Sequence, residues 1–155
     1  MIATPVNPDL LDRMSKLFVS LPHSRALDLQ YVGMDGQHAV LKVAWRADLV
    51  GNPETGAING GVITTLVDTT SAVAVTTRLS DIETIATLDL RIDYLTTASS
   101  DQPLFCRAEC YRLTRHIAFT RAVCFHTHPS EPIAHGVATF MRGSSPLPLV
   151  ANTQG

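Results

Sequence analysis

Residues 60–79 read GGVITTLVDTTSAVAVTTRL, and this stretch decides the fold of the chain. It is apolar around most of a helical circumference, which is typical of a helix covered by other structure rather than one lying on a surface. Its many threonines lower the intrinsic helix propensity, because a β-branched side chain loses rotamer freedom in a helix. Tertiary packing must therefore hold this segment, and we predict a long buried helix here.

The residues after this helix predict four strands. Apolar and polar residues alternate with a period of two from Ala86 to Tyr94, so Leu88 and Leu90 are expected on one face and Thr87 on the other. Three further strands are expected over about residues 104–114, 116–128 and 133–141.

The residues before the helix predict another helix and a hairpin. Asn7 is a helix N-cap followed by Pro8, and an apolar stripe from Leu10 to Leu21 ends at Pro22. Two strand-like runs, about 27–32 and 38–46, flank a turn at 33–36, and residues 48–59 read as a loop. The order of elements predicts an α+β domain in which an antiparallel sheet of about six strands curls around one central helix.

Composition and charge limit the classes of protein to which this chain can belong. The chain has 155 residues, 45% of them hydrophobic and 17% charged, which fits one folded domain over residues 1–142 with a mobile tail over 143–155. The net charge of -2 disfavours nucleic acid as a partner, and three cysteines without CxxC spacing indicate neither a disulfide framework nor a zinc knuckle. Because no secretory signal or bilayer-spanning segment is seen, we expect a soluble, cytoplasmic protein that does not bind membranes.

Asp68 is the only formally charged residue between Glu54 and Arg78. A carboxylate in so apolar a helix is either partnered or functional, because burying it unpaired costs several kcal/mol. One interpretation is a structural Asp that binds a neighbouring Thr or a backbone amide. The other is a general base or nucleophile.

Two glycines open the same helix. The first amides of a helix lack internal partners and carry the positive end of its dipole. At Gly60 and Gly61 no side chain covers them, so a carbonyl oxygen can approach as an oxyanion hole requires. The alternative is ordinary capping of the helix by Asn59.

Taken together, GNPETGAINGGVITTLVDTTSAVAV (residues 51–75) and TIATLDLRIDYLTTA (residues 84–98) resemble the hotdog-fold acyl-CoA thioesterases, in particular the phenylacetate-pathway branch. The resemblance covers about residues 8–142. It implies a hotdog fold and hydrolysis of an acyl-CoA substrate to a free acid and coenzyme A, without metal or cofactor.

The resemblance also implies roles for single residues. Asp68 matches the catalytic carboxylate, and the glycines match those whose backbone amide polarises the thioester carbonyl. Asn52 resembles a loop Asn that positions the water or the thioester, and Thr87 stands where some relatives place a Ser near the attacking water. Asn59 departs from the pattern, which usually has His there, and Asn cannot titrate.

Other functions remain as alternatives. A hotdog protein that binds acyl-CoA without turning it over is one, and a hotdog hydratase or dehydratase is a weaker one. Cys124, His126 and His128 alternate as a candidate metal cluster, but packing or surface roles are the favoured interpretation. Candidate contacts for coenzyme A phosphates are Arg112, Arg115, Arg121 and Arg142, although solvated arginines at sheet edges are the more common explanation.

Helix geometry predicts an assembly. Asp68 lies seven residues beyond Gly61, about 10 Å along the helix, so the two cannot serve one substrate inside one chain. A two-fold homodimer with antiparallel central helices would bring Asp68 of one subunit to Gly61 of the other. The resemblance implies the same shared sites, and a homotetramer built from two such dimers.

Overall fold

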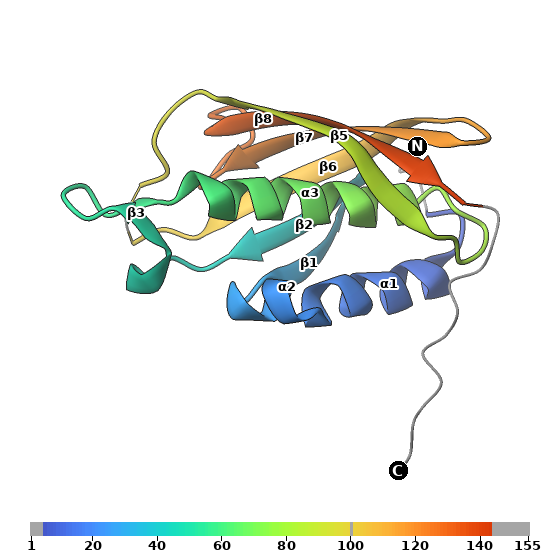
Figure 1. Ribbon diagram of the computed structural model, residues 1–155, viewed down its shortest axis with the longest axis horizontal. Coiled ribbons are helices and arrows are strands. Elements are labelled where there is room, and N and C mark those ends of the chain that lie inside the picture. The colour runs from blue at the N-terminus through green and yellow to red at the C-terminus, as the bar shows by residue number, and fades with distance from the viewer. Residues whose placement is uncertain (1–4, 100, 144–155) are drawn as a thin grey trace, which may run out of the picture.

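The computed structural model describes residues 5–99 and 101–143, so residues 144–155 of the expected tail lie outside the described residues. One antiparallel sheet has the strand order β1-β2-β6-β7-β8-β5 (Figure 1). Its strands are β1 (Gln30–Asp35), β2 (His38–Val43), β5 (Ile85–Tyr94), β6 (Leu104–Leu113), β7 (Ile117–Phe125) and β8 (Ala134–Arg142). The helices are α1 (Pro8–Ser20), α2 (Pro22–Ala26) and α3 (Gly60–Thr76), with a 3-10 turn, η1 (Ala47–Leu49). A separate small hairpin pairs β3 (Val50–Asn52) with β4 (Ala57–Ile58).

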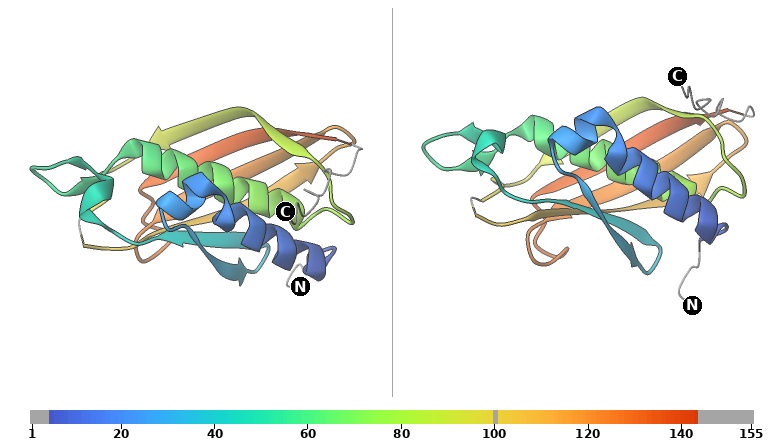
Figure 2. Two further views of the ribbon diagram at one scale, coloured as in Figure 1. Left: turned by 60° about the horizontal axis from the view of Figure 1, so that its bottom comes forward. Right: turned by 90° about the horizontal axis from the view of Figure 1, so that it is seen from below.

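The sheet curves around α3, as predicted. Figure 1 shows α3 across the inner face of the sheet, with β5 along one flank and α1 and α2 along the other; Figure 2 shows the same arrangement from two further sides. Within residues 5–99 and 101–143, no helix is long and apolar enough to cross a membrane.

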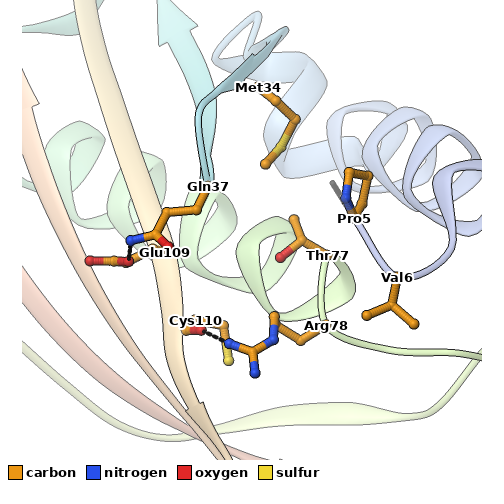
Figure 3. A pocket seen from close by; sticks show the side chains of 8 residues that line it. All are labelled: Pro5, Val6, Met34, Gln37, Thr77, Arg78, Glu109 and Cys110. Carbon is orange, nitrogen blue, oxygen red and sulfur yellow. Dashed lines mark hydrogen bonds between the residues drawn. The ribbon is translucent and has the colours of Figure 1, made fainter. Parts of the chain in front are cut away.

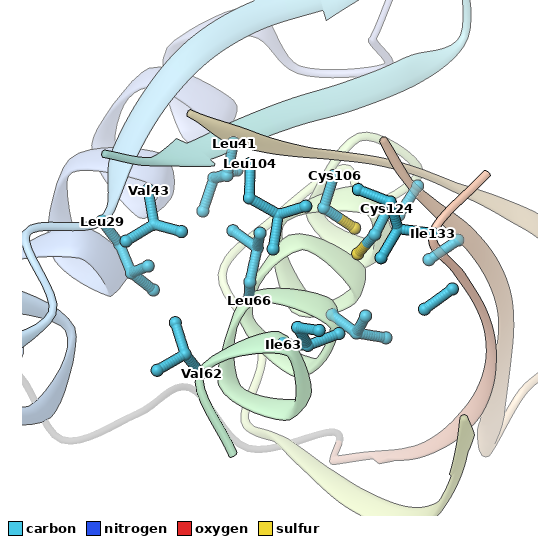
Figure 4. Packing of buried hydrophobic residues seen from close by; sticks show 14 of the residues in the cluster. Leu29, Leu41, Val43, Val62, Ile63, Leu66, Leu104, Cys106, Cys124 and Ile133 are labelled. Atoms are coloured by element: carbon cyan, nitrogen blue, oxygen red, sulfur yellow. The ribbon is translucent and has the colours of Figure 1, made fainter. Parts of the chain in front are cut away.

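The core lies between α3 and the strands that it crosses. Leu66 at the centre of α3 is fully buried and packs in one cluster with Leu41, Leu104 and Cys106 (Figure 4). Gly136 on β8 allows the close approach of the helix, because a Cβ there would lie 2.5 Å from a methyl carbon of Val67. This packing compensates for the low helix propensity of the threonines in α3.

The elements before α3 differ from the prediction at three places. The first helix ends before Pro22, as predicted, but Pro22 also begins the short helix α2, which was not expected and whose first position suits proline. The hairpin turn lies at Gly36 and Gln37, because β1 continues through Asp35, which pairs with His38. The predicted loop contains η1 and the β3–β4 hairpin.

One stripe of α3 is not covered by the rest of the chain, contrary to the expectation of a helix surrounded on both sides. Its residues are three adjacent pairs, and each pair lies four positions after the previous one, so all of them share one face of the helix. This open stripe of α3, in which every residue is exposed or half-buried, consists of Gly60, Gly61, Thr64, Thr65, Asp68 and Thr69.

A β-bulge interrupts the regular alternation of β5. Thr87 pairs with Phe140 of β8, but the next pair is Asp89 with Thr139, which leaves Leu88 as the extra residue. The prediction that Thr87 and Leu90 lie on opposite faces is therefore wrong. Because of the bulge, both side chains point toward α3 and line the same groove.

Candidate active site

A groove runs along the open stripe of α3, between α2 and β5. We call it the Asp68 groove. Its two compartments, of about 480 and 180 Å³, have five lining residues in common, namely Leu21, Ser24, Asp68, Thr69 and Thr87. The larger compartment adds His23, Thr64, Thr65 and Leu90, and the smaller one adds Phe18, Ala72, Ile85 and Phe140. After the side chains that only one compartment has, we call the end with His23, Thr64 and Thr65 the polar end and the end with Phe18, Ala72 and Phe140 the apolar end. Asp68 lines both compartments.

The Asp68 carboxylate is half-buried and held by β5. The Thr87 hydroxyl donates a hydrogen bond of 2.8 Å to Asp68 Oδ1, which is the contact that a structural Asp would make. In the part of the chain that the structure describes, Asp68 Oδ2 has no hydrogen-bond partner. Since Asp68 also lines both compartments, this second oxygen is available to a ligand or a water molecule.

At the start of α3, the two glycine amides differ. Asn59 caps the helix, because its Oδ1 accepts a hydrogen bond of 2.8 Å from the Gly61 amide. No described residue accepts from the Gly60 amide. The sequence analysis did not distinguish the two amides, but in the structure the Gly61 amide is used by the cap. The Gly60 amide is therefore the one that is free to bind a carbonyl oxygen.

The cap is anchored on its outer side by η1 and β3. The backbone amide of Asn59 donates to the Leu49 carbonyl of η1 at 2.9 Å, and a Cβ at Gly51 of β3 would lie only 2.8 Å from Asn59 Cα. Gly51 is thus needed for close packing rather than for an unusual backbone angle.

Two hydroxyls that the sequence analysis missed hold the first turn of α3. Tyr94 Oη and Thr64 Oγ1 each donate to the Gly60 carbonyl at 3.1 Å, and they lie 3.0 Å from each other. Tyr94 belongs to the quoted motif, but only its place in the sheet shows that it reaches the helix. These contacts fix the peptide next to the free Gly60 amide.

Asn52 lies apart from the Asp68 groove within one chain. It is exposed at the end of β3, where its Oδ1 accepts from the Glu54 amide at 3.0 Å. Asp68 and Gly60 are separated as well, by eight residues of α3 or about 12 Å along the helix axis. A single chain therefore brings Asp68 and Thr87 together, but neither Asn52 nor the Gly60 amide joins them.

His23 is a second residue that the sequence analysis missed. Its Nε2 lies 3.1 Å from Thr65 Oγ1, in the polar end of the groove. No sequence signal pointed to His23, because Pro22 predicted a helix end and α2 was not expected.

The remaining candidates are not arranged as a site. Cys124 faces the core opposite Cys106, while His126 lies beyond the end of β7, where its ring nitrogens contact the Ser99 amide and the Pro103 carbonyl. Burial raises the pKa of the Cys110 thiol, and a hydrogen bond with Cys106 together with burial raises that of Cys124. These thiols are therefore poor nucleophiles. Among the residues described, no three His, Cys, Asp or Glu are placed to hold a metal ion.

Two of the four candidate arginines form ion pairs elsewhere. Arg121 pairs with the buried Glu109, and Arg142 pairs with Glu83. None of the four lines the Asp68 groove.

A second cavity lies at the other end of α3. It measures about 130 Å³ and lies beside Thr77, Arg78, Glu109 and Cys110 (Figure 3). Its polar groups are engaged, since Arg78 donates to the Cys110 carbonyl and Gln37 donates to Glu109. Thr77 is nine residues beyond Asp68, about 13 Å along the helix, so this cavity is separate from the Asp68 groove.

Comparisons with known proteins bear on the family and the fold. The model of the thioesterase superfamily matches residues 55–132. A protein of known structure from Pseudomonas aeruginosa is 40% identical, with a TM-score of 0.77 and coverage of 86% of this chain and 99% of that one.

Two more distant structures share the fold. A variant of the phenylacetic acid degradation protein from Thermus thermophilus is 24% identical, with a TM-score of 0.67 and coverage of 79% of this chain and 99% of that one. A phenylacetic acid degradation-related protein from Ralstonia eutropha is 21% identical, with a TM-score of 0.70 and coverage of 85% and 98%. Among curated proteins, none matches the chain.

Proposed function

As this chain belongs to the thioesterase superfamily, we propose that it hydrolyses an acyl-CoA thioester to a free acid and coenzyme A. The observation that carries this proposal is the position of Asp68. Its carboxylate has one oxygen held by Thr87 and the other free, and it lies where a polar and an apolar compartment meet. A thioester needs such a place, because its reacting carbonyl joins an apolar acyl group to a polar thiol carrier.

In the proposed mechanism, Asp68 acts on the thioester carbonyl as general base or as nucleophile. The hydrogen bond from Thr87 orients the carboxylate. The free Gly60 amide of the other subunit binds the developing oxyanion, aided by the positive end of the α3 dipole. Asn59 shapes this helix terminus. Asn52 comes from the subunit that supplies Gly60, and its role is to position the substrate or the water.

The proposed assembly is a homodimer with two shared sites. Two features support it: the open stripe of α3, and β5, which pairs only with β8 among the described strands. An uncovered helix face and a free strand edge both favour association with another chain. Leu88 on β5 and Met141 on the neighbouring β8 are exposed, which adds apolar surface beside that edge. Two such dimers would form the homotetramer that the resemblance implies.

The apolar compartment is the proposed acyl site. Phe18 and Leu21 of the α1 region close it on one side, and Ile85 and Phe140 close it on the sheet side. In this proposal, the end of helix α1 covers the acyl group.

A panel of acyl-CoA esters tests the function. Release of free thiol, measured with a thiol reagent, is expected for at least one ester. Loss of an enoyl chromophore without thiol release would instead identify a hydratase, and saturable binding without either reaction would identify a binding protein. The ester that reacts with the highest kcat/KM also identifies the acyl group.

Replacing Thr87 with valine is expected to lower kcat by about 10-fold, because it removes the hydrogen bond that orients Asp68. The measurement is thiol release from the most reactive ester. Thr87→Ser is the matched control, since it keeps the hydroxyl and should stay within about 3-fold of the parent. If valine and serine variants behave alike, the hydroxyl does not orient the carboxylate.

Replacing Asn59 tests its two roles separately. Asn59→Ala removes the cap and should lower the free energy of unfolding by about 1 kcal/mol and kcat/KM by about 10-fold. Asn59→Ser keeps an uncharged acceptor for the Gly61 amide, so chemical denaturation should show parent-like stability. Activity lost in Asn59→Ser as well would assign a role to the amide N–H₂, whereas full activity in Asn59→Ala would reduce Asn59 to a cap. Asn59→His should retain or improve activity.

A further inference from the structure

The polar end of the Asp68 groove contains an ionisable side chain that the mechanism above does not use. Among the residues that line either compartment, His23 and Asp68 are the only ionisable ones. His23 comes from α2, and Asp68 lies one turn of α3 beyond Thr65, the residue that His23 contacts. The imidazole therefore lies on the side of Asp68 opposite to the apolar compartment.

The hydrogen bonds around Thr65 favour one tautomer of His23. The Thr65 hydroxyl donates to the Gly61 carbonyl at 3.0 Å. With that proton in use, Thr65 Oγ1 acts as the acceptor at its 3.1 Å contact with His23, and the tautomer that can donate there has its proton on Nε2. An N–H group thus points from α2 toward the open stripe of α3.

The two ends of the groove determine which part of the thioester lies near this N–H group. If the acyl group occupies the compartment of Phe18, Ala72 and Phe140, the sulfur of the thioester lies on the other side of the carbonyl, toward Thr65 and His23. Along the helix axis, Thr65 and Asp68 are only about 4.5 Å apart. A sulfur one bond away from the reacting carbon then comes within reach of the imidazole.

We infer that, when the substrate is bound, His23 Nε2–H leaves Thr65 Oγ1 and donates a hydrogen bond to the leaving sulfur of the thioester. This inference rests on the proposed function. When the C–S bond breaks, its electron pair goes to the sulfur, and the N–H group stabilises the thiolate that forms. His23 transfers no proton in this step. The thiolate takes its proton from solvent, and the proton that the reacting water releases returns to solvent, so the overall balance is that of hydrolysis: one water is consumed, and one acid and one thiol are produced. The same role applies whether Asp68 is base or nucleophile.

The test compares two leaving groups with one acyl group. The esters are the coenzyme A ester that reacts best and the matching ester of an aryl thiol, whose anion is delocalised and needs no hydrogen bond. His23→Leu should lower kcat by about 10-fold on the coenzyme A ester and by less than about 2-fold on the aryl ester. His23→Gln keeps an N–H donor and should fall between His23→Leu and the parent on the coenzyme A ester.

Controls separate this role from a structural one. His23 is exposed, so the thermal midpoint of His23→Leu should equal that of the parent, and His116→Gln, at the exposed β6–β7 turn, should leave both rates unchanged. An equal loss on both esters, or unchanged turnover of the coenzyme A ester in His23→Leu, would overturn the inference and leave the thioesterase function intact. A parent that hydrolyses neither ester would overturn both.

Discussion

Asp68→Asn is expected to lower kcat by at least ~100-fold with little change in KM. The substitution preserves the volume of the side chain and an oxygen that accepts from Thr87, so the local structure should persist. It removes the negative charge and the free carboxylate oxygen, which are what a general base or a nucleophile needs. Steady-state thiol release at saturating acyl-CoA measures the effect.

The matched control for this variant is Asp89→Asn. Asp89 lies two residues beyond Thr87 on the same strand, but it is exposed and pairs with Thr139 instead of facing α3. It should retain the turnover of the parent. Near-normal turnover in a folded Asp68→Asn protein would mean that Asp68 is purely structural and acts only through its hydrogen bond with Thr87.

Mixing two inactive variants is expected to restore about a quarter of the parent activity. The chains are Asp68→Ala and Gly60→Val, combined in equal amounts after reversible dissociation. A Cβ at Gly60 would only be in ordinary contact with Tyr94, at 3.5 Å, so the valine variant should fold while its side chain blocks access to the amide. In a mixed dimer, one site combines both defects and the other combines two intact halves. Random pairing makes half of the dimers mixed, and each mixed dimer has one of its two sites working.

Mass spectrometry of the intact assemblies confirms that mixed dimers have formed. Each variant alone, taken through the same dissociation and recovery, gives the background. Mixed dimers without activity would mean that each site lies within one chain, and the proposed mechanism would then be wrong.

The architecture was predictable because the sequence patterns that define its main elements extend over many consecutive residues. The apolar pattern of residues 60–79 and the alternation after Ile85 extend over enough residues to identify α3 and the central strands, and Asn7-Pro8 correctly marks the start of α1. Short elements were missed, since α2 has only five residues and begins at a proline that also suits a helix end.

The groove was only partly predictable. The spacing of Thr64, Thr65 and Asp68 with the two glycines contained the signal for an open stripe, but the high overall hydrophobicity of the segment concealed it. The bulge at Leu88 had no such signal, because residues 86–94 alternate perfectly by type. Only strand pairing shows that Thr87 faces Asp68.

The strand order has a consequence for how the protein acquires its activity. Thr87 lies on β5, and among the described strands β5 is joined to the sheet through β8 alone, the last strand of the chain. Pairings between such distant segments are slow to form, because the intervening loop must close first. A chain in which α3 had packed on β2, β6 and β7 before β5 paired would lack the strand that orients Asp68. The catalytic carboxylate is therefore oriented only when the last strand of the sheet, β8, has brought β5 into place.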